Sequence, residues 1–185
     1  MSNETSIIIA GFGGQGVLFA GQLLAYAGMD SGRHVTWIPS YGPEMRGGTA
    51  NCTVIISDAS IGAPIVANPD IAVVLNQPSF EKYEPLVKEG GLLVLNSDLV
   101  SPEQLREDID VVAVPANTIA EEQGNKRMLN MVTVGAVLGR RSVLSLEQVG
   151  NALRDHLPAS KSHLLDDNLT VLRRGYQLAQ EAVAA

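Results

Sequence analysis

The sequence predicts an α/β fold in three layers, with a mainly parallel, mixed sheet and helices on both of its faces. Three observations predict it. Apolar runs rich in Val, Ile and Leu lie at residues 6–10, 71–75, 92–95 and 111–114, without the alternation of a half-exposed strand. Segments with helical spacing of apolar residues follow several of these runs. A glycine-rich loop joins the first run to the first helical segment, as at the opening of a βαβ unit.

Length and composition are typical of a globular protein. The 185 residues, 45% hydrophobic and 18% charged, suffice for a substantial core, and we expect a single domain over residues 1–185. The net charge of -7 argues against a nucleic-acid partner. The first apolar run is too short for a signal peptide, and no apolar stretch approaches the length of a membrane span. We therefore expect a cytoplasmic protein with no membrane partner.

The cysteine and histidine content limits the chemistry of this chain. The single cysteine, Cys52, excludes an internal disulfide and a self-contained iron–sulfur cluster with four cysteine ligands. Its apolar surroundings predict a small buried side chain rather than a reactive thiol. His34, His156 and His163 are scattered without metal-ligand spacing, so we predict no metal site. Neither a G-x-S-x-G nor a Walker A pattern occurs.

The glycine loop has the spacing G-x-G-x-x-G, formed by Gly11, Gly13 and Gly16. Gly14 adds a fourth glycine, and Gln15 offers an amide that can donate and accept hydrogen bonds. Glycines let the backbone turn tightly and approach a ligand, and the free N–H groups of the following helix favour an anion. The fold is therefore predicted to be Rossmann-like. Two interpretations stay open: the loop contacts a phosphate-bearing or anionic ligand, or it only permits tight packing.

One feature of an ordinary dinucleotide site is missing. Such a site usually has Asp or Glu about 20 residues after the glycines, at the end of the second strand, to bind a ribose hydroxyl. Here the second strand is predicted at residues 34–38, and no acid follows until Glu44. This argues against ordinary NAD binding.

The remaining elements follow from periodicity and from turn and capping signals. The helix at 17–30 is expected to turn Val17, Leu24 and Met29 inward, together with small residues. A strand at 52–57 is expected to return antiparallel to the second strand, because only a loop separates them. Helices are predicted at 77–88, after the capping box at 101–104, at 117–123, at 128–139, after the capping box at 145–148, and from 161 to the end.

A loop rich in glycine and proline is the first candidate site beyond the glycine motif. It follows the second strand, at the edge of the sheet where open α/β folds bind ligands. Arg46 is followed by glycines and could bind a phosphate or carboxylate with two hydrogen bonds. The alternative is a structural ion pair between Glu44 and Arg46. The candidate residues of this loop are Ser40, Tyr41, Gly42, Glu44, Arg46, Gly47 and Gly48.

The second candidate cluster begins at Asn117 and continues through Asn125, Arg127 and Asn130. Lys126 and Arg127 place two cations beside amides at a predicted helix start, where they could bind an anion. The alternative is a solvated turn with a capping asparagine. Both interpretations stay open.

Three segments in series carry a resemblance to a known family. Residues 11–17 read GFGGQGV, residues 41–48 read YGPEMRGG, and residues 124–131 read GNKRMLNM. In this order and at this spacing they resemble the gamma subunit, or gamma domain, of 2-oxoacid:ferredoxin oxidoreductases. The resemblance covers nearly the whole chain. The family includes enzymes for pyruvate, 2-oxoglutarate, 2-oxoisovalerate and indolepyruvate.

The resemblance implies the reaction and the partners. A 2-oxoacid is oxidatively decarboxylated with thiamine diphosphate and Mg²⁺, electrons pass through iron–sulfur clusters to ferredoxin, and coenzyme A accepts the acyl group. This sequence has neither a thiamine-diphosphate motif nor cluster cysteines. The resemblance therefore implies that alpha, beta and ferredoxin-like delta subunits hold these cofactors. It also implies that the gamma chain is inactive alone and binds none of these cofactors by itself. The glycine loop and both clusters would then face the interface, the active site or the coenzyme A channel, with no catalytic residue on this chain alone.

An alternative function from another class remains: a stand-alone Rossmann-like module that binds a nucleotide or regulates a partner. The glycine loop is compatible with both functions. Bound nucleotide on the purified chain would favour the module, whereas dependence on partner subunits would favour the oxidoreductase.

Overall fold

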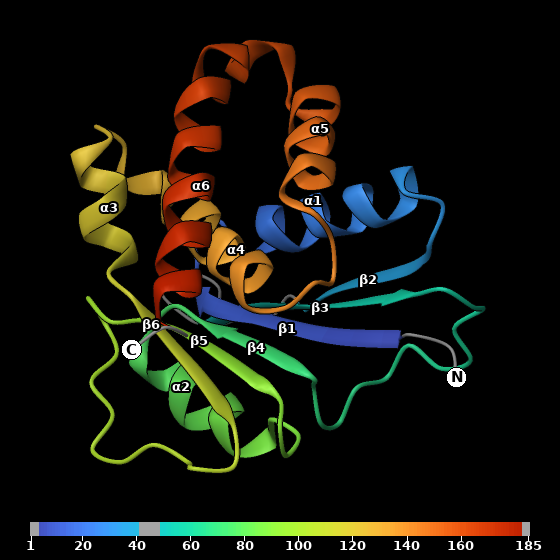
Figure 1. Cartoon of the computed structure of the whole chain (residues 1–185), viewed down its shortest axis with the longest axis vertical. Coiled ribbons are helices and arrows are strands. Elements are labelled where there is room, and N and C mark those ends of the chain that lie inside the picture. Colours follow the sequence, from blue (N-terminus) through green and yellow to red (C-terminus); the bar gives the residue numbers. More distant parts are fainter. Residues whose placement is uncertain (1–3, 41–48, 183–185) are drawn as a thin grey trace.

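The computed structural model describes residues 4–40 and 49–182. These residues form a six-stranded sheet in the order β2-β3-β1-β4-β5-β6 (Figure 1). β1, β4, β5 and β6 are parallel, whereas β3 is antiparallel to both of its neighbours, β1 and β2. The mainly parallel, mixed sheet is thus confirmed. The strands are β1 (Glu4–Phe12), β2 (His34–Ser40), β3 (Thr49–Ser57), β4 (Ile71–Val74), β5 (Leu92–Asn96) and β6 (Asp110–Val114).

Helices cover the sheet on both faces (Figure 1). One layer holds α1 (Val17–Asp30), α4 (Leu129–Arg140), α5 (Leu146–His156) and α6 (Leu165–Glu181), and the other holds α2 (Gln77–Tyr83). α3 (Ala116–Glu122) follows β6 directly. Short 3₁₀ helices lie beside them: η2 (Glu84–Leu86), η3 (Lys126–Met128) and η4 (Ala159–Leu164).

The central strands are buried on both faces, which explains their unbroken apolar runs. In β1, Ile7 and Ile9 pack into the core under α1 and α4, whereas Ile8 and Ala10 pack into the second core against α2. Successive side chains of a strand point to opposite faces. A strand covered by helices on both sides therefore needs apolar residues at every position.

Four sequence predictions about helices are wrong in detail. No helix follows the capping box at residues 101–104, because Leu105 there is 37% exposed and offers no buried apolar face. Arg106 instead ties this segment to the carbonyls of Glu84 and Val87. The helix predicted at 77–88 ends at Tyr83 and continues as η2, because Pro85 cannot donate the next helical hydrogen bond.

The other two errors concern residues at helix ends. Met29 is 58% exposed rather than buried, because it lies in the last turn of α1. The last helix begins at Leu165, and residue 161 belongs to η4. The capping box at Ser145 and Gln148 is present at the start of α5, as predicted. Within the described residues, no helix has the length and apolar character needed to cross a membrane.

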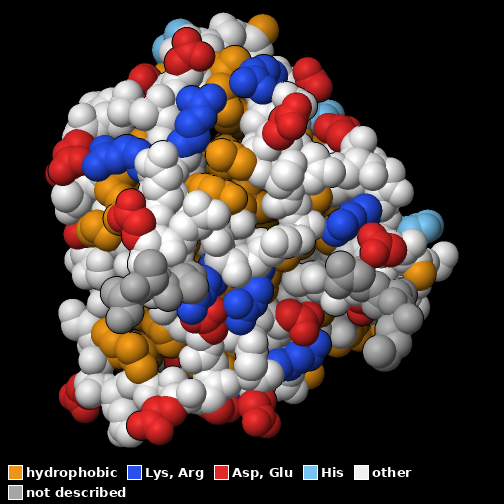
Figure 2. Space-filling view, viewed as in Figure 1, with side chains coloured by type: hydrophobic (Ala, Val, Ile, Leu, Met, Phe, Trp, Pro, Cys, Tyr) orange, Lys and Arg blue, Asp and Glu red, His pale blue; other side chains and the backbone are white. Residues whose placement is uncertain are grey.

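The outer surface has regions of different character (Figure 2). Hydrophobic side chains are visible in the hollow between α5 and α6, which Leu146, Leu169 and Leu172 line together with Arg154 and Arg173. Acidic side chains gather at the opposite end of this view, where α2 lies in Figure 1.

An ion-pair cluster joins the end of α4 to the start of β6. Asp110 accepts two hydrogen bonds from Arg140, at 2.5 and 2.6 Å, and one from Arg141 at 2.9 Å. Arg141 also donates to the carbonyl of Gly90 at 3.1 Å. The hydrogen bonds from Arg140 lower the pKa of Asp110 below its ordinary value, and partial burial opposes this change only in part.

We expect Asp110→Asn to lower the free energy of unfolding at pH 7 by about 1–3 kcal/mol, the range for charge-assisted hydrogen bonds. Because the folded-state pKa of Asp110 is lowered, its contribution is complete above the unfolded pKa of about 4 and is lost as the pH falls through the folded value. Urea titrations of both proteins at pH 7 and at pH 3 measure this. A difference that does not shrink at low pH would contradict the role of the charge.

Candidate functional site

The glycine loop leaves β1 at the carboxyl edge of the sheet and turns directly into α1. Gly14 and Gly16 have φ of 95° and 75°, in the left-handed region that favours glycine. Gly16 is the N-cap of α1 and has no side chain to cap the helix, and the first turn contains no acidic residue. The first N–H groups of α1 thus form a positively polarised helix end, and no carboxylate in the first turn of α1 neutralises it.

Gln15 binds back onto its own loop. Its Nε2 donates to the carbonyl of Leu75 at 3.2 Å, and its Oε1 accepts from the N–H of Phe12 at 2.6 Å. An added Cβ on Gly11 would lie 2.6 Å from Gln15 Oε1 and 2.9 Å from the Cβ of Leu75, so a side chain there would displace its neighbours. The side chain of Gln15 bridges the ends of β1 and β4. At this point α1 and α2, the helices that follow β1 and β4, pass to opposite faces of the sheet. Open α/β folds bind nucleotides at such a point.

Asn130 links the second predicted cluster to the glycine loop. It lies in the first turn of α4, is 4% exposed, and donates from Nδ2 to the carbonyl of Gly16 at 3.1 Å. An added Cβ on Gly16 would lie 2.4 Å from this Nδ2, so the two residues fit only because Gly16 has no side chain. Asn125 caps η3 by accepting from the N–H of Arg127 at 3.1 Å. A turn with a capping asparagine is therefore present.

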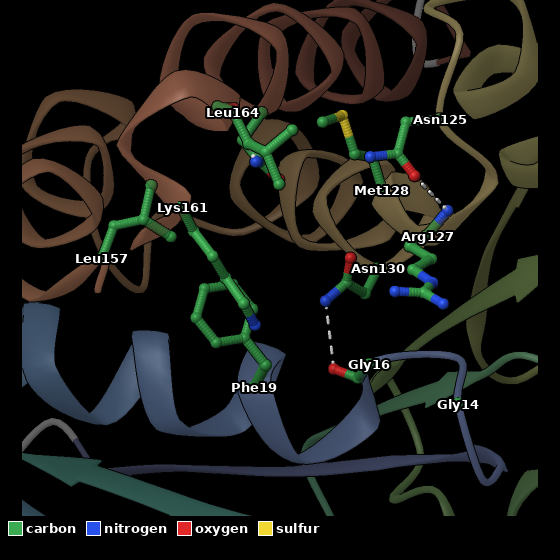
Figure 3. Close-up of a pocket in the computed structure, with 11 residues that line it drawn as sticks. Gly14, Gly16, Phe19, Asn125, Arg127, Met128, Asn130, Leu157, Lys161 and Leu164 are labelled. Atoms are coloured by element: carbon green, nitrogen blue, oxygen red, sulfur yellow. Dashed lines mark hydrogen bonds between the residues drawn. The ribbon is translucent and has the colours of Figure 1, made fainter. Parts of the chain in front are cut away.

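A cavity of about 360 Å³ opens where these elements meet (Figure 3). We call it the anion cavity. Its polar side contains the glycine loop, two cations, Arg127 and Lys161, and asparagine amides. In the described part of the chain, no acidic side chain lines it. Its lining residues are Gly14, Gly16, Phe19, Asn125, Arg127, Met128, Asn130, Leu157, Lys161, Leu164 and Asn168.

The structure brings together some of the predicted site residues and places others elsewhere. Gly14, Gly16, Asn125, Arg127 and Asn130 line the anion cavity. Gly13 is exposed in the loop, and Gly11 is buried beneath it.

Asn117 does not line the anion cavity. Its Oδ1 accepts from Nδ2 of the buried Asn96 at 2.8 Å. Nδ2 of Asn96 also donates to the carbonyl of Leu75, which Gln15 contacts as well. Asn117, which is half-buried, therefore belongs to a network of amides at the ends of the strands.

Ser40 ends β2 at the same edge of the sheet as the glycine loop. It is opposite Asn51 of β3, and Asn51 is opposite Ala10 of β1. Ser40 thus lies at the edge of the sheet expected from the sequence. Its candidate residues, Tyr41, Gly42, Glu44, Arg46, Gly47 and Gly48, lie outside the described residues.

Lys161, Phe19 and Asn168 were not predicted as site residues. Lys161 lies on η4, far along the chain from the glycine loop. No local pattern marks it, since Lys161, Ser162 and His163 read as an ordinary polar helix start. Phe19 and Asn168 read as parts of helical stripes.

Cys52 is buried beneath α1, as predicted. Burial raises the pKa of its thiol to about 11, so the thiol is protonated at neutral pH. Its Sγ donates to the carbonyl of Val17 at 3.5 Å. Among the described residues, no group of three or more His, Cys, Asp or Glu side chains could hold a metal ion.

With this geometry in view, comparison with known proteins defines the class. Residues 6–178 match the family described as pyruvate ferredoxin/flavodoxin oxidoreductase, and the chain belongs to this family. The resemblance inferred from the three sequence segments is thereby confirmed.

Relatives of this chain are oxidoreductase subunits. It is 39% identical over 179 residues to ketoisovalerate oxidoreductase subunit VorA of Methanothermobacter marburgensis, covering 96% of this chain and 37% of that protein. It is 35% identical to 2-oxoglutarate synthase subunit KorC of Methanocaldococcus jannaschii, covering 95% and 94%. The chain thus spans 37% of the length of its VorA relatives and nearly all of a KorC relative.

Solved structures share the fold. The gamma subunit of keto/oxoacid ferredoxin oxidoreductase from Geobacter sulfurreducens aligns with a TM-score of 0.83 and 30% identity, covering 97% of this chain and 98% of that one. The 2-oxoglutarate:ferredoxin oxidoreductase from Magnetococcus marinus aligns with a TM-score of 0.87 and 24% identity, over 96% of this chain and 31% of that one. The second likeness concerns the fold alone.

We expect Gly16→Ala to lower the free energy of unfolding by about 2–3 kcal/mol, from left-handed strain and a lost hydrogen bond to Asn130. Gly14→Ala is the matched control, because Gly14 also has positive φ but its added Cβ would meet no atom within 4 Å. It should cost about 1 kcal/mol. Urea unfolding of the two variants measures the difference, and equal losses would exclude a role for the Asn130 contact.

Proposed function

We propose that this chain is the gamma subunit of a 2-oxoacid:ferredoxin oxidoreductase, which decarboxylates a 2-oxoacid oxidatively and forms an acyl-CoA. Membership of the family and the names of its relatives support this role. The named relatives are subunits for ketoisovalerate and for 2-oxoglutarate, so the proposed substrate is a 2-oxoacid as a class. We place the complex in the cytoplasm.

The cofactors of the reaction are assigned to the partner subunits. This chain has one cysteine, and it is buried and protonated, so it cannot provide the four thiolates of a cluster. Thiamine diphosphate, Mg²⁺ and the iron–sulfur clusters would be held by alpha, beta and ferredoxin-like delta subunits, and ferredoxin would accept the electrons. The gamma chain would be inactive alone and would help to close the active site and the coenzyme A channel.

The observation that carries the proposal is the anion cavity. Coenzyme A has several phosphate groups, and this cavity offers Arg127, Lys161 and the uncapped start of α1 on one side. These positive groups gather on a chain whose net charge is -7. The described residues of this chain would bind and orient the phosphates, whereas the chemical step would occur on the partner subunits.

The stand-alone nucleotide module is less well supported. Gln15 bridges the ends of β1 and β4, the point at which an open α/β fold would bind a dinucleotide. The second strand also ends at Ser40 without an acid for a ribose hydroxyl. The loop would therefore hold a ligand only from its outer side, in the anion cavity.

We expect Lys161→Gln, and separately Arg127→Gln, to raise the KM for coenzyme A about tenfold in the reconstituted complex, equivalent to about 1.4 kcal/mol of lost binding. The kcat should stay unchanged, because the phosphates are bound equally in the ground state and the transition state. Steady-state kinetics with varied coenzyme A measures both constants.

Lys126→Gln is the matched control for these two variants. Lys126 lies on the same short helix as Arg127, but its Nζ pairs with Glu121 at 3.1 Å and it does not line the anion cavity. Removing its charge changes the net charge equally. If all three variants behaved alike, the effect would be one of overall charge, and the cavity would lose its proposed role.

Arg46 is proposed to contact a carboxylate or phosphate through the planar fork of its guanidinium group, which lysine cannot reproduce. We expect Arg46→Lys to leave the subunit folded and assembled but to lower turnover of the complex at least about tenfold. Kinetics on the reconstituted complex, with assembly checked by size, measures this. If Arg46 only pairs with Glu44, Arg46→Lys should be nearly silent and Glu44→Gln should match it.

A further inference from the structure

The hollow between α5 and α6 is separate from the anion cavity, because none of its described lining residues lines that cavity. It has a volume of about 340 Å³, and we call it the α5/α6 groove. Its floor is aliphatic: Leu169 and Leu172 are 6% and 1% exposed, and Leu146 beside them is half-buried. Figure 2 shows hydrophobic side chains inside this hollow and basic side chains near it.

Gly150 of α5 leaves the space that the groove occupies. Glycine in a helix interior is less stable than alanine, so its presence there needs a reason. The glycines of the α4–α6 contact have one, because a Cβ on Gly135 or Gly175 would collide with the backbone of the facing helix. A Cβ on Gly150 would make only ordinary contacts, 3.4 Å from Leu169 Cδ2 and 3.8 Å from Arg154 Nη1. Packing within this chain therefore does not require glycine at position 150.

Two exposed arginines, Arg154 and Arg173, flank the aliphatic floor. Arg154 donates to the amide oxygen of Asn151 at 2.8 Å. In the described part of the chain, no carboxylate lies within 4 Å of either guanidinium group. Glu147 is the one acid among the described lining residues, so the groove has an excess of positive charge. Guanidinium groups bind carboxylates with two parallel hydrogen bonds, so the matching surface is acidic.

We propose that the α5/α6 groove docks an acidic segment of a partner subunit. An apolar side chain of that segment would pack against Leu169 and Leu172, and its carboxylates would bind Arg154 and Arg173. An anchor residue in a pocket, with arginines beside it, is the arrangement that contributes most of the binding energy in many protein interfaces. The inference rests on the proposed function, because it takes the partner from the same complex.

A second copy of this chain is a poorer occupant. The chain has an acidic segment with an apolar residue of its own, in which Leu105, 37% exposed, lies between Glu103 and Glu107. Arg106 ties this segment to the carbonyl of Glu84 in η2, and Figure 1 shows it at the opposite end of the molecule from α5 and α6. Docking between copies would therefore be head-to-tail, which leads to rings or open filaments rather than to a closed pair.

Filling the groove tests the inference. Gly150→Leu should raise the dissociation constant of the purified chain for the co-expressed alpha, beta and delta subunits at least about tenfold. Gly150→Ala is the matched control, because its methyl group makes ordinary contacts and leaves most of the groove open. It should change the dissociation constant less than about twofold. Both variants replace a helix glycine, so neither should unfold at a lower urea concentration than the wild-type chain.

The charges are tested separately. Arg173→Gln should raise the same dissociation constant about fivefold, and the double variant with Arg154→Gln should raise it at least about tenfold and weaken its dependence on salt. Arg174→Gln is the matched control. Arg174 is the next residue of α6, but its Nη2 pairs with Glu122 Oε2 at 2.6 Å and it does not line the groove. Its removal should leave the dissociation constant unchanged.

The possible outcomes distinguish the two proposals. If folded Gly150→Leu bound the partner subunits as tightly as the wild-type chain, the docking site would be overturned and the proposed function would stand. If the wild-type chain did not bind these subunits at all, both proposals would fall together. If the wild-type chain self-associated in sedimentation experiments and Gly150→Leu abolished this, the groove would hold a second copy, which would also overturn the assignment.

Discussion

The hydrogen bond from Asn130 to the carbonyl of Gly16 is the contact on which the rest of the site depends. It joins the start of α4 to the start of α1, two segments separated by more than half of the chain. The contact requires a residue without a side chain at position 16, in a left-handed conformation that glycine adopts easily. Because the bond holds both helix starts together, the amides and Arg127 lie beside the positive end of α1.

A second constraint decides where a ligand can bind. In many open α/β folds the ligand occupies the crevice between diverging strands. Here Gln15 bonds across that point, to the backbone of β1 and to the carbonyl of Leu75 after β4. The open space lies instead on the side of α4 and η4, where Lys161 approaches. The glycine motif therefore packs against the strand ends on its inner side and lines the anion cavity on its outer side.

Local signals in the sequence were sufficient for much of this fold. The glycine spacing, the capping box at Ser145 and the buried apolar strands act within a few residues, and each is present where the sequence predicts it. Predictions that depended on distant partners were less successful. The capping box at 101–104 lacks a buried apolar face and forms no helix, and Met29 lies beyond the region that α1 buries. In both cases tertiary packing decided against local propensity.

The sequence alone determined the fold class, the glycine loop, the second cluster and the family, because these depend on residue type and on spacing along the chain. The tertiary structure decided which of the candidates share a space. It brought Lys161 and Phe19 to the glycine loop and placed Asn117 outside the cavity, in a hydrogen bond with the buried Asn96. The physical reason is that a cavity is bounded by segments far apart in sequence, whose approach depends on how helices pack on the sheet.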